Sequence, residues 1–198
     1  MSKPSLREPL LDAGLRVMFR SGYGGAGVRD IVADAKAPQG SFTNHFRSKE
    51  AFAGEVLERY FAYVKGLVAE ALDDRSRPPR ERLRRYLDII TGKLEEAEWA
   101  RGCLIGDLSL EAPPHSEALR LQLAEIFTQW RQPFRDCIAE GQALREITRS
   151  FPADDLADFL IASWQGAIMR MKVERGPAPL ERFKTIMFAT IFAKKEDN

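Results

Sequence analysis

The segment 37–50, A-P-Q-G-S-F-T-N-H-F-R-S-K-E, constrains the fold of this chain more than any other. Pro38 predicts the start of a helix, because its missing N–H and fixed φ cost nothing in a first turn. Phe42 and Phe46 lie about one turn apart and give that helix an apolar side. Ser48 offers an oxygen to the free amides of a following helix. Two helix starts this close together require the first helix to be short.

Polar side chains of the kind that bind DNA occupy the rest of this segment. Hydroxyl, amide and imidazole groups form hydrogen bonds with base edges and phosphates. We expect them to face away from the two phenylalanines; they are Gln39, Ser41, Thr43, Asn44 and His45.

A second short helix is predicted directly upstream, over residues 27–35. Val28, Ile31 and Val32 fall on one face of it, and Lys36 begins a tight turn after it. Two short helices joined by a turn of three or four residues form a helix-turn-helix. An ordinary helical hairpin with a solvated polar face is the alternative interpretation.

The run from Gly22 to Phe52 resembles the DNA-binding domain of TetR-family transcriptional regulators. The matching residues are Gly22, Tyr23, Ile31, Ala35, Gly40, Phe46, Ser48, Lys49 and Glu50. The run departs from the family pattern at Gly27, where a Ser or Thr cap is usual, at Gln39, where Lys is common, and at residues 43–45, which are aromatic-rich in many members.

The resemblance implies a set of DNA contacts in this chain. Gln39 and Thr43 are expected at base edges, whereas Ser48 and Lys49 are expected at phosphates. The full predicted set is Arg29, Gln39, Gly40, Ser41, Thr43, Asn44, His45, Ser48 and Lys49.

The amino-acid composition is compatible with a DNA-binding protein and narrows the classes of protein to which the chain could belong. The 198 residues are 44% hydrophobic, and residues 1–50 carry a net charge of +3 against −2 for the remainder. A basic end is expected where one end of a protein meets phosphate. No apolar run approaches the roughly 20 residues that span a bilayer, and the two cysteines lack the spacing of a metal site. We therefore expect a cytoplasmic protein without cofactor or metal.

Helical periodicity continues to the end of the chain, and no strand pattern or repeat interrupts it. The expected architecture is all-α with about nine helices, divided into a DNA-binding domain (1–50) and a ligand-binding and dimerisation domain (51–198). The expected helices beyond the helix-turn-helix lie near 5–21, 48–72, 83–94, 103–111, 116–138, 153–175 and 179–194.

The last two predicted helices carry more apolar surface than one small core needs. Because most oligomers have two-fold symmetry, we expect a homodimer through these helices, as is usual in TetR-like regulators. The predicted interface residues are Phe159, Ser163, Phe183, Ile186, Met187 and Thr190.

Aromatic residues in the second half of the chain are candidates for a small-molecule pocket, although they also fit a plain core. The candidate lining is Trp99, Cys103, Phe127, Trp130, Trp164, Ile168, Met169 and Lys172. Lys172 is either a ligand or thiolate partner or a lysine whose stem lies on apolar surface. No nucleophile elbow, phosphate loop or His/Cys cluster indicates an enzyme.

Two further segments, residues 101–108 and 164–172, resemble a TetR subgroup with G-C-L-x-x-x-L and W-x-G-A-x-x-x-x-K elements. That subgroup includes regulators of electrophile-detoxifying reductases and of genes for small unsaturated acids. Cys103 is expected at a helix N-terminus, which stabilises thiolate. It is either a sensor thiol or a small buried hydrophobe.

The sequence as a whole predicts a one-component transcriptional repressor that binds operator DNA as a dimer and is released by a small-molecule inducer. A DNA-binding regulator without an inducer and a helical adaptor bound to protein are the alternatives. Sequence-specific, salt-sensitive DNA binding separates the regulators from the adaptor.

Overall fold

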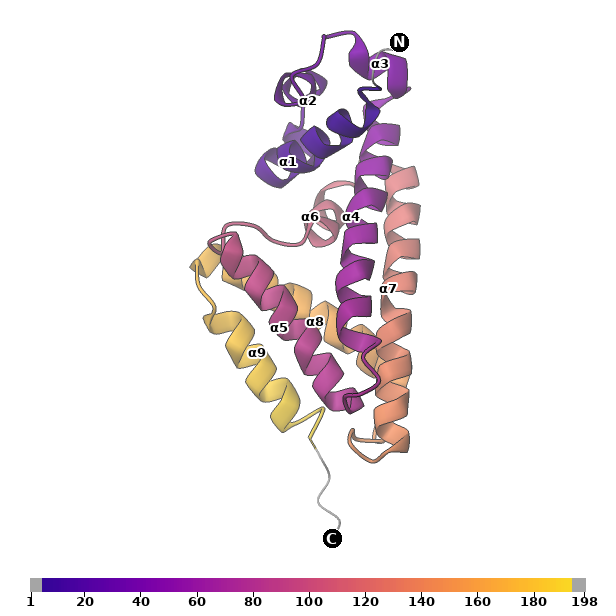
Figure 1. Cartoon of the computed structure of the whole chain (residues 1–198), viewed down its shortest axis with the longest axis vertical. Coiled ribbons are helices and arrows are strands. Elements are labelled where there is room, and N and C mark those ends of the chain that lie inside the picture. The colour runs from indigo at the N-terminus through magenta and orange to yellow at the C-terminus, as the bar shows by residue number, and fades with distance from the viewer. Residues whose placement is uncertain (1–4, 194–198) are drawn as a thin grey trace. The chain divides into compact units, whose positions relative to one another are not determined.

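The computed structural model describes residues 5–193, and within them it contains nine helices and no strand, as predicted (Figure 1). The helices are α1 (Arg7–Gly25), α2 (Val28–Asp34), α3 (Ser41–His45), α4 (Lys49–Leu72), α5 (Pro79–Glu96), α6 (Leu104–Glu111), α7 (Glu117–Ala143), α8 (Ala153–Glu174) and α9 (Ala178–Ala189).

The chain forms two compact units, each built from two stretches of sequence. We call residues 5–63 and 104–126 the head, and residues 64–103 and 127–193 the body. Helices α4 and α7 each begin in the head and continue into the body along the chain (Figure 1). The head therefore combines α1, α2 and α3 with α6 and the first turns of α4 and α7.

Close packing of α1 on α4 organises the head. At Gly14 the two helices approach so closely that a Cβ would lie 2.4 Å from a ring carbon of Phe52. Helix α1 is interrupted at Gly22, where φ is +69°, a backbone conformation that favours glycine. The predicted end of the first helix at residues 21–22 is therefore present as a break.

Helix α3, the second or recognition helix of the predicted helix-turn-helix, begins later than predicted. Residues 39–40 form a turn, and the Pro38 carbonyl accepts a hydrogen bond from the Ser41 N–H at 2.9 Å. Gly40 is the N-cap residue, so α3 contains only five residues. The prediction of a helix start at Pro38 was wrong, because this proline lies in the turn that precedes the helix.

The start of α4 follows the prediction. The Ser48 hydroxyl accepts a hydrogen bond from the Ala51 N–H at 3.0 Å, and Glu50 lies in the first turn. A serine cap of this kind stabilises a helix start by about 1 kcal/mol. Downstream, residues 73–78 connect α4 to α5, and α7 continues through Pro133 as one helix.

In the body, α9 packs against both α8 and α5. It ends at Ala189, whereas the prediction extended to residue 194, which lies outside the described residues. Arg80 of α5 donates hydrogen bonds to the carbonyls of Phe188 and Phe192 at 3.0 and 2.6 Å. The Phe188 carbonyl, in the last turn of α9, therefore has a side-chain partner, and the same arginine holds the turn that follows the helix.

Candidate functional site

An aromatic cluster holds the recognition helix on the start of α4. The rings of Phe42 and Phe46 lie 5.3 Å apart, and Phe52 of α4 lies 5.0 and 4.7 Å from them. All three side chains are buried. Offset and edge-to-face pairs of this kind add about 0.5–1.5 kcal/mol each beyond their buried area. The polar residues of α3 are thereby fixed in orientation.

The exposed residues of this helix and its preceding turn carry hydrogen-bonding groups. Gln39, Gly40, Thr43 and Asn44 are exposed. The Thr43 hydroxyl donates to the Gly40 carbonyl at 3.1 Å. The Gln39 and Asn44 side chains form no hydrogen bond within residues 5–193, so their amides are available to an external partner.

Three other predicted DNA contacts lie in different environments. Ser41 is buried on the same side as Phe42, and the structure does not bring it to the exposed face. His45 is half-buried beside Phe46, with 6.2 Å between ring centroids. Arg29, on α2, is exposed and forms no ion pair within the described part of the chain.

Ser48 and Lys49 both make contacts inside the head. The Ser48 hydroxyl caps α4, as described above. The Lys49 ammonium donates to the Gly24 carbonyl at 3.2 Å and lies 4.8 Å from the centroid of the Tyr23 ring. Lys49 is thus half-buried and already paired with backbone and aromatic partners.

Arg47 is a candidate contact that the sequence prediction missed. Its side chain is exposed and forms no ion pair within residues 5–193. Along the chain it lies between the buried Phe46 and the cap residue Ser48. A basic residue next to a helix start was the available indication, because phosphate binds where free amides and a cation meet.

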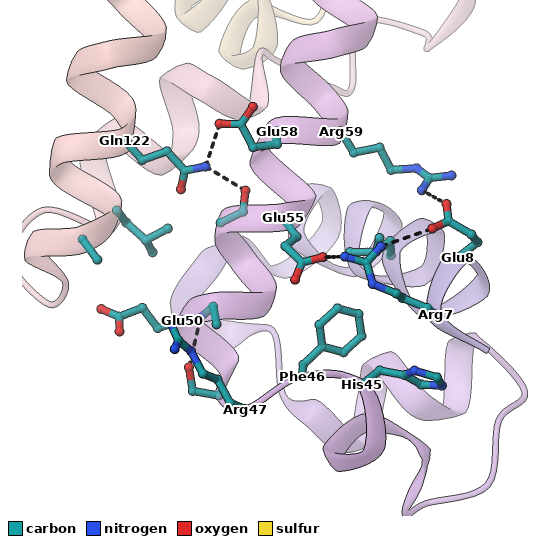
Figure 2. A pocket seen from close by; sticks show the side chains of 16 residues that line it. Arg7, Glu8, His45, Phe46, Arg47, Glu50, Glu55, Glu58, Arg59 and Gln122 are labelled. Atoms are coloured by element: carbon teal, nitrogen blue, oxygen red, sulfur yellow. Dashed lines mark hydrogen bonds and ion pairs between the residues drawn. The ribbon is translucent and has the colours of Figure 1, made fainter. Parts of the chain in front are cut away.

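Arg47 also lines an open groove of about 860 Å³ in the head. Figure 2 shows the side chains of Arg7, Glu8, Glu55 and Arg59 around it. Arg7 pairs with Glu55, and Arg59 pairs with Glu8. These charges neutralise one another, whereas Arg47 forms no ion pair with any described residue.

The candidate ligand residues of the body differ in burial. Cys103, Trp130, Trp164 and Ile168 are buried; Trp99, Phe127 and Lys172 are half-buried; Met169 is exposed. The structure therefore does not bring Met169 into the interior. Phe127 stacks on Trp130 with 6.2 Å between ring centroids, and Trp164 packs against Phe183 at 5.2 Å.

Tyr86 of α5 joins this set, although it was not among the predicted lining residues. Burial raises the pKa of its hydroxyl, negative charge on Cys103 raises it further, and the neighbouring Trp130 indole lowers it. The Trp130 N–H faces this hydroxyl but forms no hydrogen bond of normal geometry. Cys103, Tyr86 and Trp130 therefore lie near one another in the body.

The two thiols occupy different positions. Cys103 directly precedes α6 and is buried. Cys137 lies inside α7, donates to the Pro79 carbonyl at 3.4 Å, and has its pKa raised to about 11 by burial. At neutral pH the Cys137 thiol is protonated, which disfavours reaction with electrophiles.

The predicted dimer residues divide into two groups. Phe159, Ile186 and Thr190 are exposed, and Ser163 is half-buried. Phe183 packs on Trp164, and Met187 is buried in the protomer, so the structure does not bring Met187 to the surface. Two further apolar side chains of α8, Met169 and Val173, are exposed.

Neither a metal cluster nor a membrane span is found in residues 5–193. No three His, Cys, Asp or Glu side chains among them are grouped so that they could hold a metal ion. None of their helices has the length and apolar character needed to cross a membrane.

Family models match two parts of the chain. The model described as bacterial regulatory proteins, tetR family, matches residues 10–56. The model described as tetracyclin repressor-like, C-terminal domain, matches residues 79–187, more than half of the chain.

Individual proteins are similar over almost the whole length. The HTH-type transcriptional repressor DhaR of Mycobacterium sp. (strain GP1) is 45% identical over 197 residues, which cover 100% of this chain and 98% of DhaR. The crystal structure of regulatory protein TetR from Rhodobacter sphaeroides has a TM-score of 0.88 at 31% identity, covering 92% of this chain and 97% of that one. The reduced form of E. coli NemR has a TM-score of 0.84 at 28% identity, covering 96% and 100%.

Proposed function

Because the chain belongs to the TetR family of bacterial transcriptional regulators, we propose that it is a one-component repressor. It binds operator DNA as a cytoplasmic homodimer and is released by a small-molecule inducer. The observation that carries this proposal is the exposed polar face of α3, which the buried phenylalanine cluster fixes in orientation. The names of DhaR and NemR as repressors support the direction of regulation.

Base reading is assigned to Gln39 and Thr43, with Asn44 beside them. The amide of glutamine can form two hydrogen bonds with adenine in the major groove. Phosphate contacts are assigned to Ser48, Lys49 and His45 as predicted, together with Arg47. Arg29 and Gly40 complete the proposed DNA contacts; Ser41 is not among them, because its side chain is buried and its N–H donates to the Pro38 carbonyl.

A mobility shift with the DNA upstream of the protein's own gene tests this function. Specific binding that weakens steeply between low and moderate salt is expected, because phosphate contacts release counterions. Binding that does not distinguish this DNA from an unrelated fragment would remove the repressor proposal and favour the adaptor.

The proposed dimer interface is the outward surface of α8 and α9. It includes Phe159, Ser163, Ile186 and Thr190, which are exposed or half-exposed in the protomer. Phe183 reaches it from its position on Trp164, and Met187 supports it from beneath. Two heads on one dimer would bind two half-sites, as two-fold symmetric operators require.

The proposed inducer is a soft electrophile such as an unsaturated carbonyl compound, and Cys103 is its target. The thiolate sulfur bonds to the β-carbon, the π electron pair moves to the α-carbon, and that carbon takes a proton from water. The proposed lining is Trp99, Phe127, Trp130, Trp164, Ile168 and Lys172, without the exposed Met169. Similarity to NemR, whose structure is described as a reduced form, supports a reactive thiol.

Treatment with N-ethylmaleimide tests the thiol. We expect wild-type protein to release operator DNA and Cys103→Ser to retain it. Cys137→Ser serves as the matched control and should respond like wild type, because the raised pKa of Cys137 keeps that thiol protonated. Equal release from Cys103→Ser would make the inducer site non-covalent.

A further inference from the structure

The backbone of one residue in the head, Gly24, is held from both sides by opposite charges. The Gly24 N–H donates to the Glu111 carboxylate of α6 at 3.2 Å, and the Gly24 carbonyl accepts from the Lys49 ammonium of α4 at 3.2 Å. Hydrogen bonds to charged groups are about twice as strong as neutral ones. The end of α1 is therefore held by one residue of α6 and one of α4.

Gly22 makes room for this arrangement. A Cβ at this position would lie 2.5 Å from each carboxylate oxygen of Glu111, and the φ of +69° already disfavours other residues. The same glycine thus permits both the break in α1 and the close approach of Glu111.

A second contact lies five residues further along the chain. The Ser116 hydroxyl donates to the Glu50 carboxylate in the first turn of α4, and it accepts from the Leu119 N–H at 3.0 Å. Ser116 is buried. We call the segment from Glu111 to Ser116, which joins α6 to α7, the 111–116 corner.

Gly24 and Glu50, the residues to which Glu111 and Ser116 bond, lie on either side of the helix-turn-helix in the sequence. Gly24 lies four residues before α2 begins, and Glu50 lies five residues after α3 ends. At its other end, α6 begins directly after Cys103. The corner is therefore connected to the proposed inducer site by only one short helix of eight residues.

We propose that Glu111 and Ser116 are positioning residues that couple the inducer site to the orientation of the recognition helix. This inference rests on the proposed function. Displacement of α6 withdraws the Glu111 carboxylate from the Gly24 N–H, so that the Lys49 ammonium alone still holds the end of α1. The α1–α2 connection and the start of α4 then move independently, so α3 loses its fixed orientation.

Selective ¹⁵N-glycine labelling tests the contact without any DNA. Gly24 has open space around it, so its resonance can be assigned by its loss in Gly24→Ala. Glu111→Ala should shift the Gly24 amide resonance and speed its hydrogen exchange. Glu117→Ala is the matched control, because Glu117 is an exposed glutamate that pairs with Arg120 on its own helix.

The coupling itself is tested with N-ethylmaleimide. In wild type, alkylation should shift the Gly24 resonance, and in Cys103→Ser it should not. Operator binding provides the second readout, as the ratio of dissociation constants with and without the reagent. We expect Glu111→Ala and Ser116→Ala to lower this ratio about tenfold, within the usual range of allosteric coupling. Glu117→Ala should leave the ratio unchanged.

The outcomes separate this inference from the function on which it rests. If the wild-type protein binds no operator, the repressor proposal is refuted. A shift of the Gly24 resonance on alkylation would still support the coupling. A Gly24 resonance that stays in place after Cys103 is alkylated would overturn the coupling. Glu111→Ala and Ser116→Ala proteins that release operator as wild type does would also overturn it.

Discussion

The head and the body are stabilised by different kinds of contact. In the head, helices of five and seven residues are held by three phenylalanine rings and by charged side chains bonded to backbone groups. In the body, long helices enclose charged residues. Lys184 is buried and bonds to Asp88 and Glu181 at 2.8 and 2.7 Å.

This difference follows from the kind of surface that each unit has to expose. A recognition helix of five residues cannot stabilise itself, since isolated helices shorter than about 12 residues are marginal in water. Its order must come from tertiary contacts on one face, which leaves the other face free for DNA. The helices α5, α8 and α9 of the body are longer, with 18, 22 and 12 residues, and surplus apolar side chains such as Phe159 and Ile186 lie on the surface of α8 and α9.

Removal of Phe52, the central phenylalanine of the aromatic cluster, should destabilise the head most severely. Phe52→Ala deletes a fully buried ring that contacts both Phe42 and Phe46, and such changes cost about 3–5 kcal/mol. Operator binding should be lost with it. Denaturant unfolding measures the change in free energy, and a loss below about 1 kcal/mol would show that other contacts hold α3.

Phe151→Ala is the matched control in the body. This phenylalanine is 56% exposed, so its removal should change the unfolding free energy by less than about 0.5 kcal/mol.

A charged residue on the apolar surface of α8 and α9 should prevent dimerisation without unfolding the protomer. Ile186 is 56% exposed, and Ile186→Asp would bury an unpaired carboxylate in the proposed interface at a cost of about 2–4 kcal/mol. Sedimentation should then show monomers with unchanged helix content. Ile186 is a cleaner probe than Phe183, which also packs on Trp164.

An intact dimer after this change would place the interface on another surface. Leu144→Asp is the control, because Leu144 is equally exposed in the body but lies outside α8 and α9.

Local sequence patterns predicted the head better than the body, and the reason is physical. The Ser48 cap, the break at Gly22 and the apolar pair Phe42 and Phe46 depend on neighbours within a few residues. Such contacts are visible in a sequence window. The role of Lys49 depends on Gly24, which is 25 residues away, and no window shows that pairing.

In the body, the contacts that the sequence did not predict join residues that lie far apart in the chain. Tyr86 fitted the apolar face of an amphipathic helix, and only the fold brings it near Cys103 and Trp130. The end of α9 depends on Arg80, more than a hundred residues earlier. The exposure of Met169 and the burial of Met187 likewise depend on how α8 and α9 pack.

The smallest expected effect concerns the buried lysine of the body. Burial alone would lower the pKa of Lys184, but its hydrogen bonds to Asp88 and Glu181 outweigh burial and raise it. A raised pKa means that this stabilisation is complete below the ordinary lysine pKa of about 10.4 and is lost as pH rises through the folded value. Lys184→Met should lower stability by on the order of 1 kcal/mol at neutral pH.

The pH profile distinguishes this ion pair from simple packing. Between about pH 9 and pH 12, wild type should lose more stability than Lys184→Met, since only wild type carries the titrating ammonium. Lys93→Met, which removes an exposed pair with Glu96, is the control. Parallel wild-type and Lys184→Met profiles would assign Lys184 to packing alone.

The central claim is that the exposed residues of α3 and of the turn before it read operator sequence, and binding of two variants to a panel of operator mutants tests it most directly. We predict that Gln39→Ala changes base preference at one position of each half-site, by about 1–3 kcal/mol. Arg47→Ala should weaken binding to all operators alike and reduce the salt slope by about 1. If both variants instead lose affinity equally for every sequence, Gln39 does not read a base and the account is contradicted.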